Sequence, residues 1–228
     1  MSKKVFITGC AKSGTTLLLR MCYAFKNTEV LYRQGSNGHE LTFNDFVNHK
    51  STESFVFGKR HPPAILSNVL LPEFEEQMSS ILSNDIGIVN VIRDGRDVVL
   101  SDGNYVKPKR WIETIKQRSS NMYGKVIDLE VRYEDLIRNP TKVQKQMEEV
   151  FGLQSKHSFT DYPDYVDDWV FEWNVSILGR QGKSNETNYG KRKLSEKSIG
   201  KDLEAYKDLC LPNELVDFDN CLKDLGYV

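Results

Sequence analysis

The chain has 228 residues, of which 39% are hydrophobic and 28% charged, and its formal net charge is -1. These values are ordinary for a globular protein and predict a single domain over residues 1–228. A charge so close to zero argues against bulk nucleic-acid binding. We see no signal sequence or membrane-length apolar run, so we expect no membrane partner and a cytoplasmic location. The four cysteines form no C-x-x-C pair and predict reduced, structural thiols.

Apolar segments at residues 5–8, 55–58, 86–92 and 126–131 predict buried strands. The third is nearly continuous in β-branched residues, as expected for a strand covered on both faces. Helical patterns at 17–25, 72–82, 98–101 and 111–123 lie between or after these strands. This alternation predicts an α/β fold in three layers, α/β/α, with a central parallel sheet.

The last part of the chain predicts one clear helix, a long loop and a helical pair. Asn139 can cap a helix that starts at Pro140 and stops at Gly152. Residues 179–200 are rich in Gly, Ser, Asn and Lys, which predicts a long loop and a candidate lid. Helices are expected over 201–210 and 212–225.

The first motif is the run GCAKSGTT at residues 9–16, between the first strand and the first helix. The amides and the positive dipole end at such a helix start can cradle a phosphate. Gly9 and Gly14 allow a tight turn and close approach of the backbone to a ligand. Further donors come from Lys12 and from the hydroxyls of Ser13, Thr15 and Thr16. The alternative is a strand-to-helix turn that binds nothing.

The spacing resembles a P-loop but differs at one position. The pattern G-x-x-x-x-G-K-[ST] places Lys after the second Gly, where this chain has Thr15. The lysine lies inside the loop instead, at Lys12. This difference argues against triphosphate chemistry built on Mg²⁺ and the P-loop lysine.

The second motif, KRHPP at residues 59–63, follows the second strand. Lys59 and His61 can face one pocket, and histidine is suited to accept a proton from a hydroxyl near neutral pH. A surface-loop histidine is the simpler alternative.

The third motif, RDGRD at residues 93–97, ends the third strand. Arg93 can offer a fork of donors to a phosphate, and Ser101 faces back toward the same site. Asp94 and Asp97 can instead hold the turn or cap the next helix. The alternative for the whole motif is an ordinary salt-bridged turn.

The fourth motif, Tyr133-Glu134-Asp135, stands at the end of the last predicted strand. Tyr133 can stack on a base or hydrogen-bond to its edge. We interpret the two carboxylates as partners of loop backbone or of an arginine, and not as a metal-binding pair.

Together these motifs resemble those of sulfotransferases that use 3′-phosphoadenosine 5′-phosphosulfate (PAPS). The family's Lys-Ser-Gly-Thr-Thr loop for the 5′-phosphosulfate matches residues 12–16. Its Arg-Asp-Pro-Arg-Asp motif for the 3′-phosphate, with a Ser eight residues after the first Arg, matches 93–97 and Ser101, with Gly95 in place of Pro. Its Lys-Thr-His-hydrophobic-Pro segment resembles 59–63, and its Tyr-Glu-Asp-Leu sequence stands at 133–136.

The resemblance covers about residues 5–152 and departs from the family in two places. Leu17 stands where many members have a Trp that stacks on adenine. No Gly-x-Trp follows the basic loop, because Asp202 occupies the usual Trp position. Candidates for the basic loop over the 3′-phosphate are Lys191, Arg192, Lys193 and Lys197.

The resemblance implies a P-loop-like sulfotransferase domain and in-line transfer of a sulfuryl group from PAPS to a hydroxyl or amine, leaving 3′,5′-ADP. It implies His61 as general base, assisted by Lys12 and Lys59. No metal is needed, because the protein supplies the cations that Mg²⁺ supplies in kinases. The implied donor-binding residues are Lys12, Ser13, Gly14, Thr15, Thr16, Arg93, Ser101, Tyr133, Lys191, Arg192 and Lys193.

The acceptor is expected to be a small molecule or a carbohydrate, bound by variable segments such as 31–50, 111–123 and 161–173. The last segment mixes aromatic and acidic residues, which could bind a sugar or an amine. Its alternative is a segment that packs its aromatic side on the core and leaves its acids in solvent. Two other functions remain open: an atypical P-loop kinase or NTPase, and a non-catalytic nucleotide-binding module.

Overall fold

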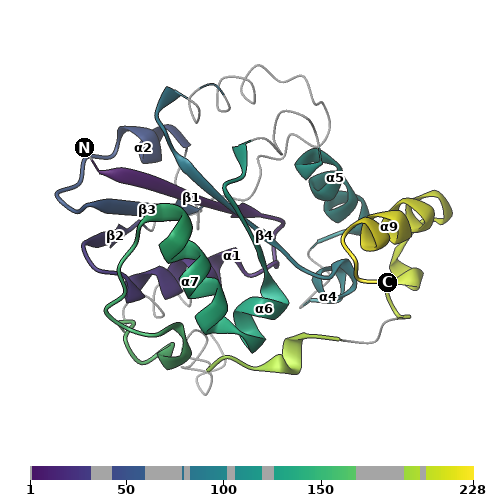
Figure 1. Ribbon diagram of the computed structural model, residues 1–228. Helices are drawn as coiled ribbons and strands as arrows, with labels where there is room; N and C mark the ends of the chain where they lie inside the picture. Colours follow the sequence, from purple (N-terminus) through teal and green to yellow (C-terminus); the bar gives the residue numbers. More distant parts are fainter. Residues whose placement is uncertain are drawn as a thin grey trace, which may run out of the picture.

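A parallel sheet forms the centre of the computed structural model (Figure 1). The structure describes residues 2–31, 43–59, 79, 83–101, 106–119, 126–167, 193–200 and 204–228. Within these ranges the sheet has five strands in the order β2-β3-β1-β4-β5, and every pairing is parallel. The strands are β1 (Lys3–Gly9), β2 (Thr28–Val30), β3 (Phe55–Lys59), β4 (Gly87–Ile92) and β5 (Leu129–Arg132).

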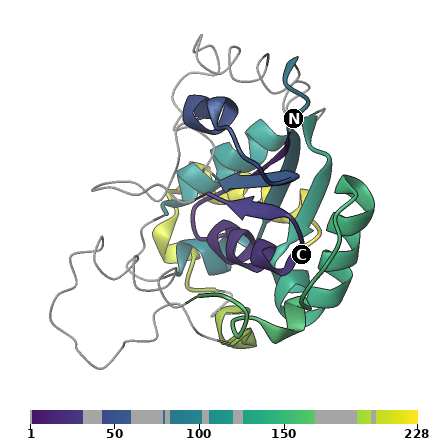
Figure 2. The ribbon, with the colours of Figure 1, turned by 90° about the vertical axis from the view of Figure 1, so that its left-hand side faces the viewer.

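Helices cover both faces of the sheet, which confirms the predicted three-layer α/β/α fold with its P-loop-like strand, turn and helix. One face carries α1 (Thr15–Met21), α6 (Tyr133–Arg138) and α7 (Pro140–Phe151). The other carries α2 (Phe43–Asn48), α4 (Gly95–Val99), α5 (Pro108–Arg118) and α9 (Pro212–Asp224). Figure 2 shows this arrangement from the side, with α2 and α5 opposite α7.

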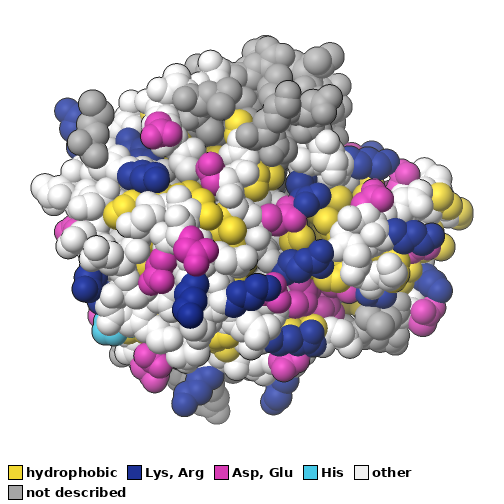
Figure 3. All heavy atoms as spheres, viewed as in Figure 1, with side chains coloured by type: hydrophobic (Ala, Val, Ile, Leu, Met, Phe, Trp, Pro, Cys, Tyr) yellow, Lys and Arg dark blue, Asp and Glu magenta, His cyan; other side chains and the backbone are white. Residues whose placement is uncertain are grey.

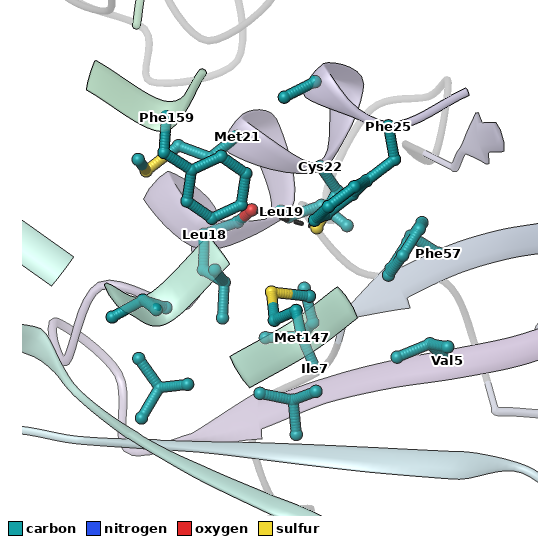
Figure 4. Packing of buried hydrophobic residues seen from close by; sticks show 14 of the residues in the cluster. Val5, Ile7, Leu18, Leu19, Met21, Cys22, Phe25, Phe57, Met147 and Phe159 are labelled. Atoms are coloured by element: carbon teal, nitrogen blue, oxygen red, sulfur yellow. Dashed lines mark hydrogen bonds between the residues drawn. The ribbon is translucent and has the colours of Figure 1, made fainter. Parts of the chain in front are cut away.

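Side chains alternate along β1, because successive residues of a strand point to opposite faces. Val5 and Ile7 face the cluster around α1 and α7, which Figure 4 shows with Leu18 and Met147. Phe6 faces the opposite layer. Each fully buried side chain of this size stabilises the fold by about 1.5–3 kcal/mol, so β1 is fixed from both sides.

Several predicted elements are confirmed, with shifted ends. The strands at 5–8, 55–58 and 86–92 correspond to β1, β3 and β4, and α7 begins at Pro140 and ends before Gly152, whose φ is 74°. The predicted cap of α7 is wrong, because the Asn139 side chain accepts no hydrogen bond from the helix. The first helix starts at Thr15 and becomes a 3₁₀ segment at Cys22–Ala24. The helix expected at 212–225 is α9.

Two further elements exist with different ends, and one predicted helix was wrong. The last strand starts at Leu129 and not at 126. Before it the Asp128 amide still donates to the Ile88 carbonyl at 3.0 Å, but the Ile88 amide donates to the Asp128 carboxylate at 2.7 Å in place of a backbone oxygen. The helix expected at 111–123 spans Pro108–Arg118, since Pro108 suits a first helical position. Residues 204–210 form turns and a 3₁₀ segment, Lys207–Leu209, in place of a helix.

The sequence patterns gave no indication of β2, α2 or α6, which are short. The helix expected at 72–82 lies almost wholly outside the described residues. Among the helices that the structure describes, none has both the length and the apolarity to cross a membrane. Basic and acidic side chains are interspersed on the face drawn in Figure 3.

Candidate functional site

The described residues of the four motifs meet at one edge of the sheet. Because β3, β1, β4 and β5 are parallel neighbours, their carboxyl ends lie side by side. The loop at residues 9–16 follows β1, Lys59 ends β3, Arg93 follows β4 and Tyr133 begins α6 directly after β5. Ligands of parallel α/β sheets bind beyond this edge, so the arrangement defines the candidate site.

The loop after β1 has a backbone that its two glycines make possible. Gly9 has a φ of 147° and Gly14 a φ of 99°. A Cβ atom on Gly9 would lie 2.3 Å from the Val91 carbonyl oxygen, and one on Gly14 would lie 2.4 Å from the Tyr133 ring. Both positions therefore need glycine for conformation and for space.

Lys12 also has a positive φ, 69°. This conformation costs a non-glycine residue about 1–2 kcal/mol. The Lys12 carbonyl accepts a hydrogen bond of 2.8 Å from Arg93 Nη1, which holds the loop in this shape. The Lys12 side chain is exposed, and its ammonium group makes no hydrogen bond or ion pair within the part of the chain that the structure describes. It is therefore a cation in the loop that a ligand could reach.

Ser13 closes the loop on itself. Its amide and its hydroxyl both donate to the Cys10 carbonyl, at 3.1 and 2.6 Å. Gly14 precedes α1 and has no side chain with which to cap it, and no side-chain cap is found among the described residues, so the amides of Thr15 and Thr16 at the start of α1 can bind a ligand. Thr15 is buried and Thr16 half-buried.

Arg93 joins the loop to the fourth motif. It is only 6% exposed, and its guanidinium carbon lies 4.3 Å from the centre of the Tyr133 ring. The same ring contacts Gly14 of the loop. Tyr133 thus packs between the loop and Arg93, and one face of its ring is taken by the cation. This packing favours a hydroxyl or edge contact to a ligand over base stacking.

The Asp94 carboxylate has the capping role that was one of its two predicted roles. It accepts the Arg96 amide at the start of α4, at 2.9 Å, and pairs with the Arg96 guanidinium at 2.6 Å. This hydrogen bond raises the pKa of Arg96 above its ordinary value. The predicted structural role of Glu134 is also confirmed, since its carboxylate accepts the Asp94 amide at 3.0 Å.

Asp97 holds part of the predicted loop at 179–200. Its carboxylate accepts the Gly200 amide at 3.0 Å, and Arg138 of α6 pairs with Glu196 at 2.8 Å. Residues 193–200 are thereby tied to α4 and α6 beside the site. Lys193 is exposed there, whereas Lys191, Arg192 and the rest of the predicted loop lie outside the described residues.

Lys59 and Ser101 are both buried, at 2% and 7% exposure. The Ser101 hydroxyl donates to the Val98 carbonyl at 2.7 Å. To donate to a phosphate it would have to rotate away from this carbonyl. His61 lies outside the described residues, so its position relative to Lys59 stays a prediction.

The described half of the aromatic and acidic segment fits its packing alternative. Tyr162 is buried, and Tyr165 packs on the core and donates its hydroxyl to the Met21 carbonyl at 3.2 Å. Asp161 and Asp164 are exposed. At the start of the predicted segment 111–123, Trp111 is a core residue, with its ring 4.5 Å from that of Phe218. Residues 168–173 are not described.

Cys10 is a buried loop thiol. Burial raises its pKa to about 11, although a hydrogen bond with Thr114 opposes this shift. All four cysteines are free, as predicted. Among the residues that the structure describes, no group of three His, Cys, Asp or Glu side chains is arranged to hold a metal ion.

Two features of the site were missed by sequence reasoning. One is the hydrogen bond from Arg93 to the loop carbonyl, which joins residues 81 positions apart. The other is Tyr227, whose hydroxyl donates to Glu134 at 2.9 Å. No local pattern around Tyr227 connects it with the motifs, so only the fold reveals it.

No family model and no curated protein sequence matches the chain. Solved structures do. The sulfotransferase domain of the Synechococcus PCC 7002 olefin synthase aligns with a TM-score of 0.59 and 13% identity, over 100% of this chain and 96% of that one. Mouse sulfotransferase SULT7A1, complexed with PAP, aligns with a TM-score of 0.51 and 13% identity, over 97% and 83%. The chain has a sulfotransferase-like fold.

Proposed function

We propose that this chain is a sulfotransferase that moves a sulfuryl group from PAPS to a hydroxyl or amine of a small molecule or carbohydrate. The observation that carries this proposal is the hydrogen bond that joins Arg93 to the backbone of the loop at Lys12. A phosphate cradle and a buried guanidinium lie on neighbouring strands and are joined by a 2.8 Å hydrogen bond. The fold likeness to a sulfotransferase complexed with PAP, adenosine 3′,5′-bisphosphate, supports the same choice.

The residues fit a donor with two separate phosphates. The amides of Thr15 and Thr16, with the exposed Lys12, would hold the 5′-phosphate end. Arg93 would hold the 3′-phosphate, because a guanidinium pairs well with phosphate oxygens. Further contacts to these phosphates would come from Ser13, Gly14, Ser101, Tyr133, Lys191, Arg192 and Lys193.

The chemistry would be an in-line displacement at sulfur. The acceptor oxygen or nitrogen bonds to sulfur while the bond from sulfur to the bridging phosphate oxygen breaks, and 3′,5′-ADP leaves. His61 takes the acceptor's proton. Lys12 neutralises the charge that develops on the leaving phosphate, and Lys59 assists at the sulfonate. The place of Lys59 supports this role, because it ends β3 next to β1, from which the loop follows.

The kinase or NTPase alternative requires a cation after the second glycine of the loop. That position is Thr15, which is 2% exposed and carries no charge. The third possibility, a nucleotide-binding module without catalysis, shares the donor site and differs only in turnover.

The test is transfer of labelled sulfuryl from PAPS to a panel of phenols, amines and oligosaccharides, in EDTA. We expect turnover by the wild-type chain and a loss of about 10²–10⁴-fold in kcat for His61→Ala, the usual effect of removing a general base. Binding of 3′,5′-ADP should stay within about twofold of wild type, because the base does not hold the donor.

The matched control is His157→Ala. His157 is exposed, and its ring stacks on that of Tyr165 with the ring centres 5.1 Å apart. It belongs to none of the four motifs, so its loss should leave kcat unchanged. Binding of 3′,5′-ADP without transfer to any acceptor would support the non-catalytic module. Metal-dependent hydrolysis of ATP would support the kinase or NTPase alternative.

A further inference from the structure

A closed ring of hydrogen bonds, which we call the ring behind Arg93, joins Asp94, Glu134, Tyr227 and Arg96 next to Arg93 in the chain. The Asp94 amide donates to Glu134 Oε1 at 3.0 Å, and the Tyr227 hydroxyl donates to Glu134 Oε2 at 2.9 Å. Arg96 Nη2 donates to the Tyr227 carbonyl at 2.9 Å and to Asp94 Oδ2 at 2.6 Å. The ring therefore returns to the residue that follows Arg93. Three of its members belong to the sequence motifs, and Tyr227 comes from the segment after α9.

The segment after α9 is itself held in place. Gly226 has a φ of 70°, which turns the chain back toward the sheet. The Arg132 guanidinium carbon lies 5.0 Å from the centre of the Tyr227 ring, and Arg132 Nη2 donates to the Leu225 carbonyl. The Tyr227 ring would keep its cation–π contact with Arg132 even without its hydroxyl.

The ring of hydrogen bonds constrains the backbone beside Arg93 and so the direction in which its side chain points. Glu134 holds the amide on the carboxyl side of Arg93, and the Lys12 carbonyl holds its guanidinium at 2.8 Å. A guanidinium selects a phosphate by geometry as well as by charge. A small rotation of the 93–94 peptide would move Arg93 away from a 3′-phosphate and would disturb the first turn of α1 far less.

We propose that Tyr227 is a positioning residue that sets the preference of this site for nucleotides with a 3′-phosphate, through Glu134 and Asp94. This inference rests on the proposed function. Its basis is that the Tyr227 hydroxyl is the donor that secures the second oxygen of Glu134. Without it, the Asp94 amide is the one hydrogen-bond donor that the Glu134 carboxylate keeps among the described residues, and the 93–94 peptide is less constrained.

The test compares two ligands that differ only in the 3′-phosphate. The dissociation constants of 3′,5′-ADP and 5′-AMP are measured by calorimetric competition for the wild-type chain and Tyr227→Phe. We expect 3′,5′-ADP to bind about 5–10-fold more weakly to the variant, part of the full effect of a hydrogen bond to a charged group. Binding of 5′-AMP should change by less than about twofold, since it does not use Arg93 through a 3′-phosphate.

The control is Tyr165→Phe. The Tyr165 hydroxyl also donates a hydrogen bond, to the Met21 carbonyl at 3.2 Å, and its ring packs on the core at the opposite face of the sheet. Among the described residues it contacts none of Asp94, Arg96, Glu134 and Tyr227. This variant should lose similar thermal stability and keep the affinity ratio of the two ligands. The comparison separates a positioning role from a general loss of stability.

Each outcome decides a different point. A wild-type chain with no preference for 3′,5′-ADP overturns the proposed donor site and this inference with it. A wild-type preference that Tyr227→Phe retains overturns the inference alone, as does an equal loss for both ligands. If Tyr227→Phe does not fold, Glu134→Gln replaces it, because glutamine keeps an acceptor for Asp94 and weakens the bond to Tyr227; a retained ratio again overturns the inference.

Discussion

Two segments of this chain mix charged and apolar residues, and the fold treats them in opposite ways. In the turn after β4 the charges are inside, with Asp94 and Asp97 only 7% and 1% exposed. In residues 161–167 the acids are outside, while Tyr162 and Val166 are buried. Burying a charge is costly unless it is paired. Buried charge, and not an acidic or aromatic composition, therefore distinguishes the candidate site from the rest of the chain.

The physical reason lies in what precedes each segment. The turn after β4 continues a strand that is buried along its whole length, so its first residues lie in the interior and need internal partners. Residues 161–167 follow a short 3₁₀ segment at the surface of α1 and α7, where only one side needs burial.

Asp94→Ala should have the largest effect. It leaves the buried Arg96 without its ion-pair partner and α4 without its cap. Breaking a buried pair costs about 3–5 kcal/mol of unfolding free energy. The matched variant, Asp164→Ala, removes an exposed carboxylate and should stay within about 0.5 kcal/mol. Urea denaturation measures both, and equal losses would remove the distinction between the two segments.

Gly14→Ala should come next. The new methyl group would lie 2.4 Å from the Tyr133 ring, in a backbone with a φ of 99°, and we expect a loss of about 2–4 kcal/mol together with weaker 3′,5′-ADP binding. Gly152→Ala has a φ of 74° and open space around it, so it should lose only about 1–2 kcal/mol and bind normally. Normal ligand binding by Gly14→Ala would show that loop shape does not matter.

The Cys10 thiol gives the smallest effect, on the pH dependence of stability. Its pKa in the folded chain is raised to about 11 from an ordinary 9.0 by burial. The stability from this group is therefore fully present below pH 9 and is lost as the pH rises toward 11. Urea denaturation at pH 8 and pH 10.5 should show a smaller decline for Cys10→Ala than for the wild-type chain. An identical decline would mean that the Cys10 thiol is not shielded from water in the folded chain.

The place of the candidate site could be predicted from the sequence, because motifs that follow parallel strands must lie at the same edge of the sheet. Lys59, Arg93 and Tyr133 each follow or end an apolar strand, and that is enough to bring them together. The contacts between them are a different matter. Arg93 meets the Lys12 carbonyl, and Tyr227 meets Glu134, across 81 and 93 residues of chain, and no periodicity encodes such pairs.

The end of a strand also could not be predicted where a side chain takes the place of a backbone hydrogen-bond partner. Asp128 does so before β5, so the apolar residues at 126 and 127 do not extend that strand. The general base, His61, and the single-domain organisation stay predictions. So do the basic residues Lys191, Arg192 and Lys193 as ligands of the 3′-phosphate.

The most direct test of the central claim is a crystal structure of the wild-type chain with 3′,5′-ADP. We expect the 5′-phosphate at the amides of Thr15 and Thr16 beside Lys12, and the 3′-phosphate within hydrogen-bond distance of the Arg93 guanidinium. A nucleotide bound with its 3′-phosphate in solvent, or away from the carboxyl edge of the sheet, would contradict the proposed donor site.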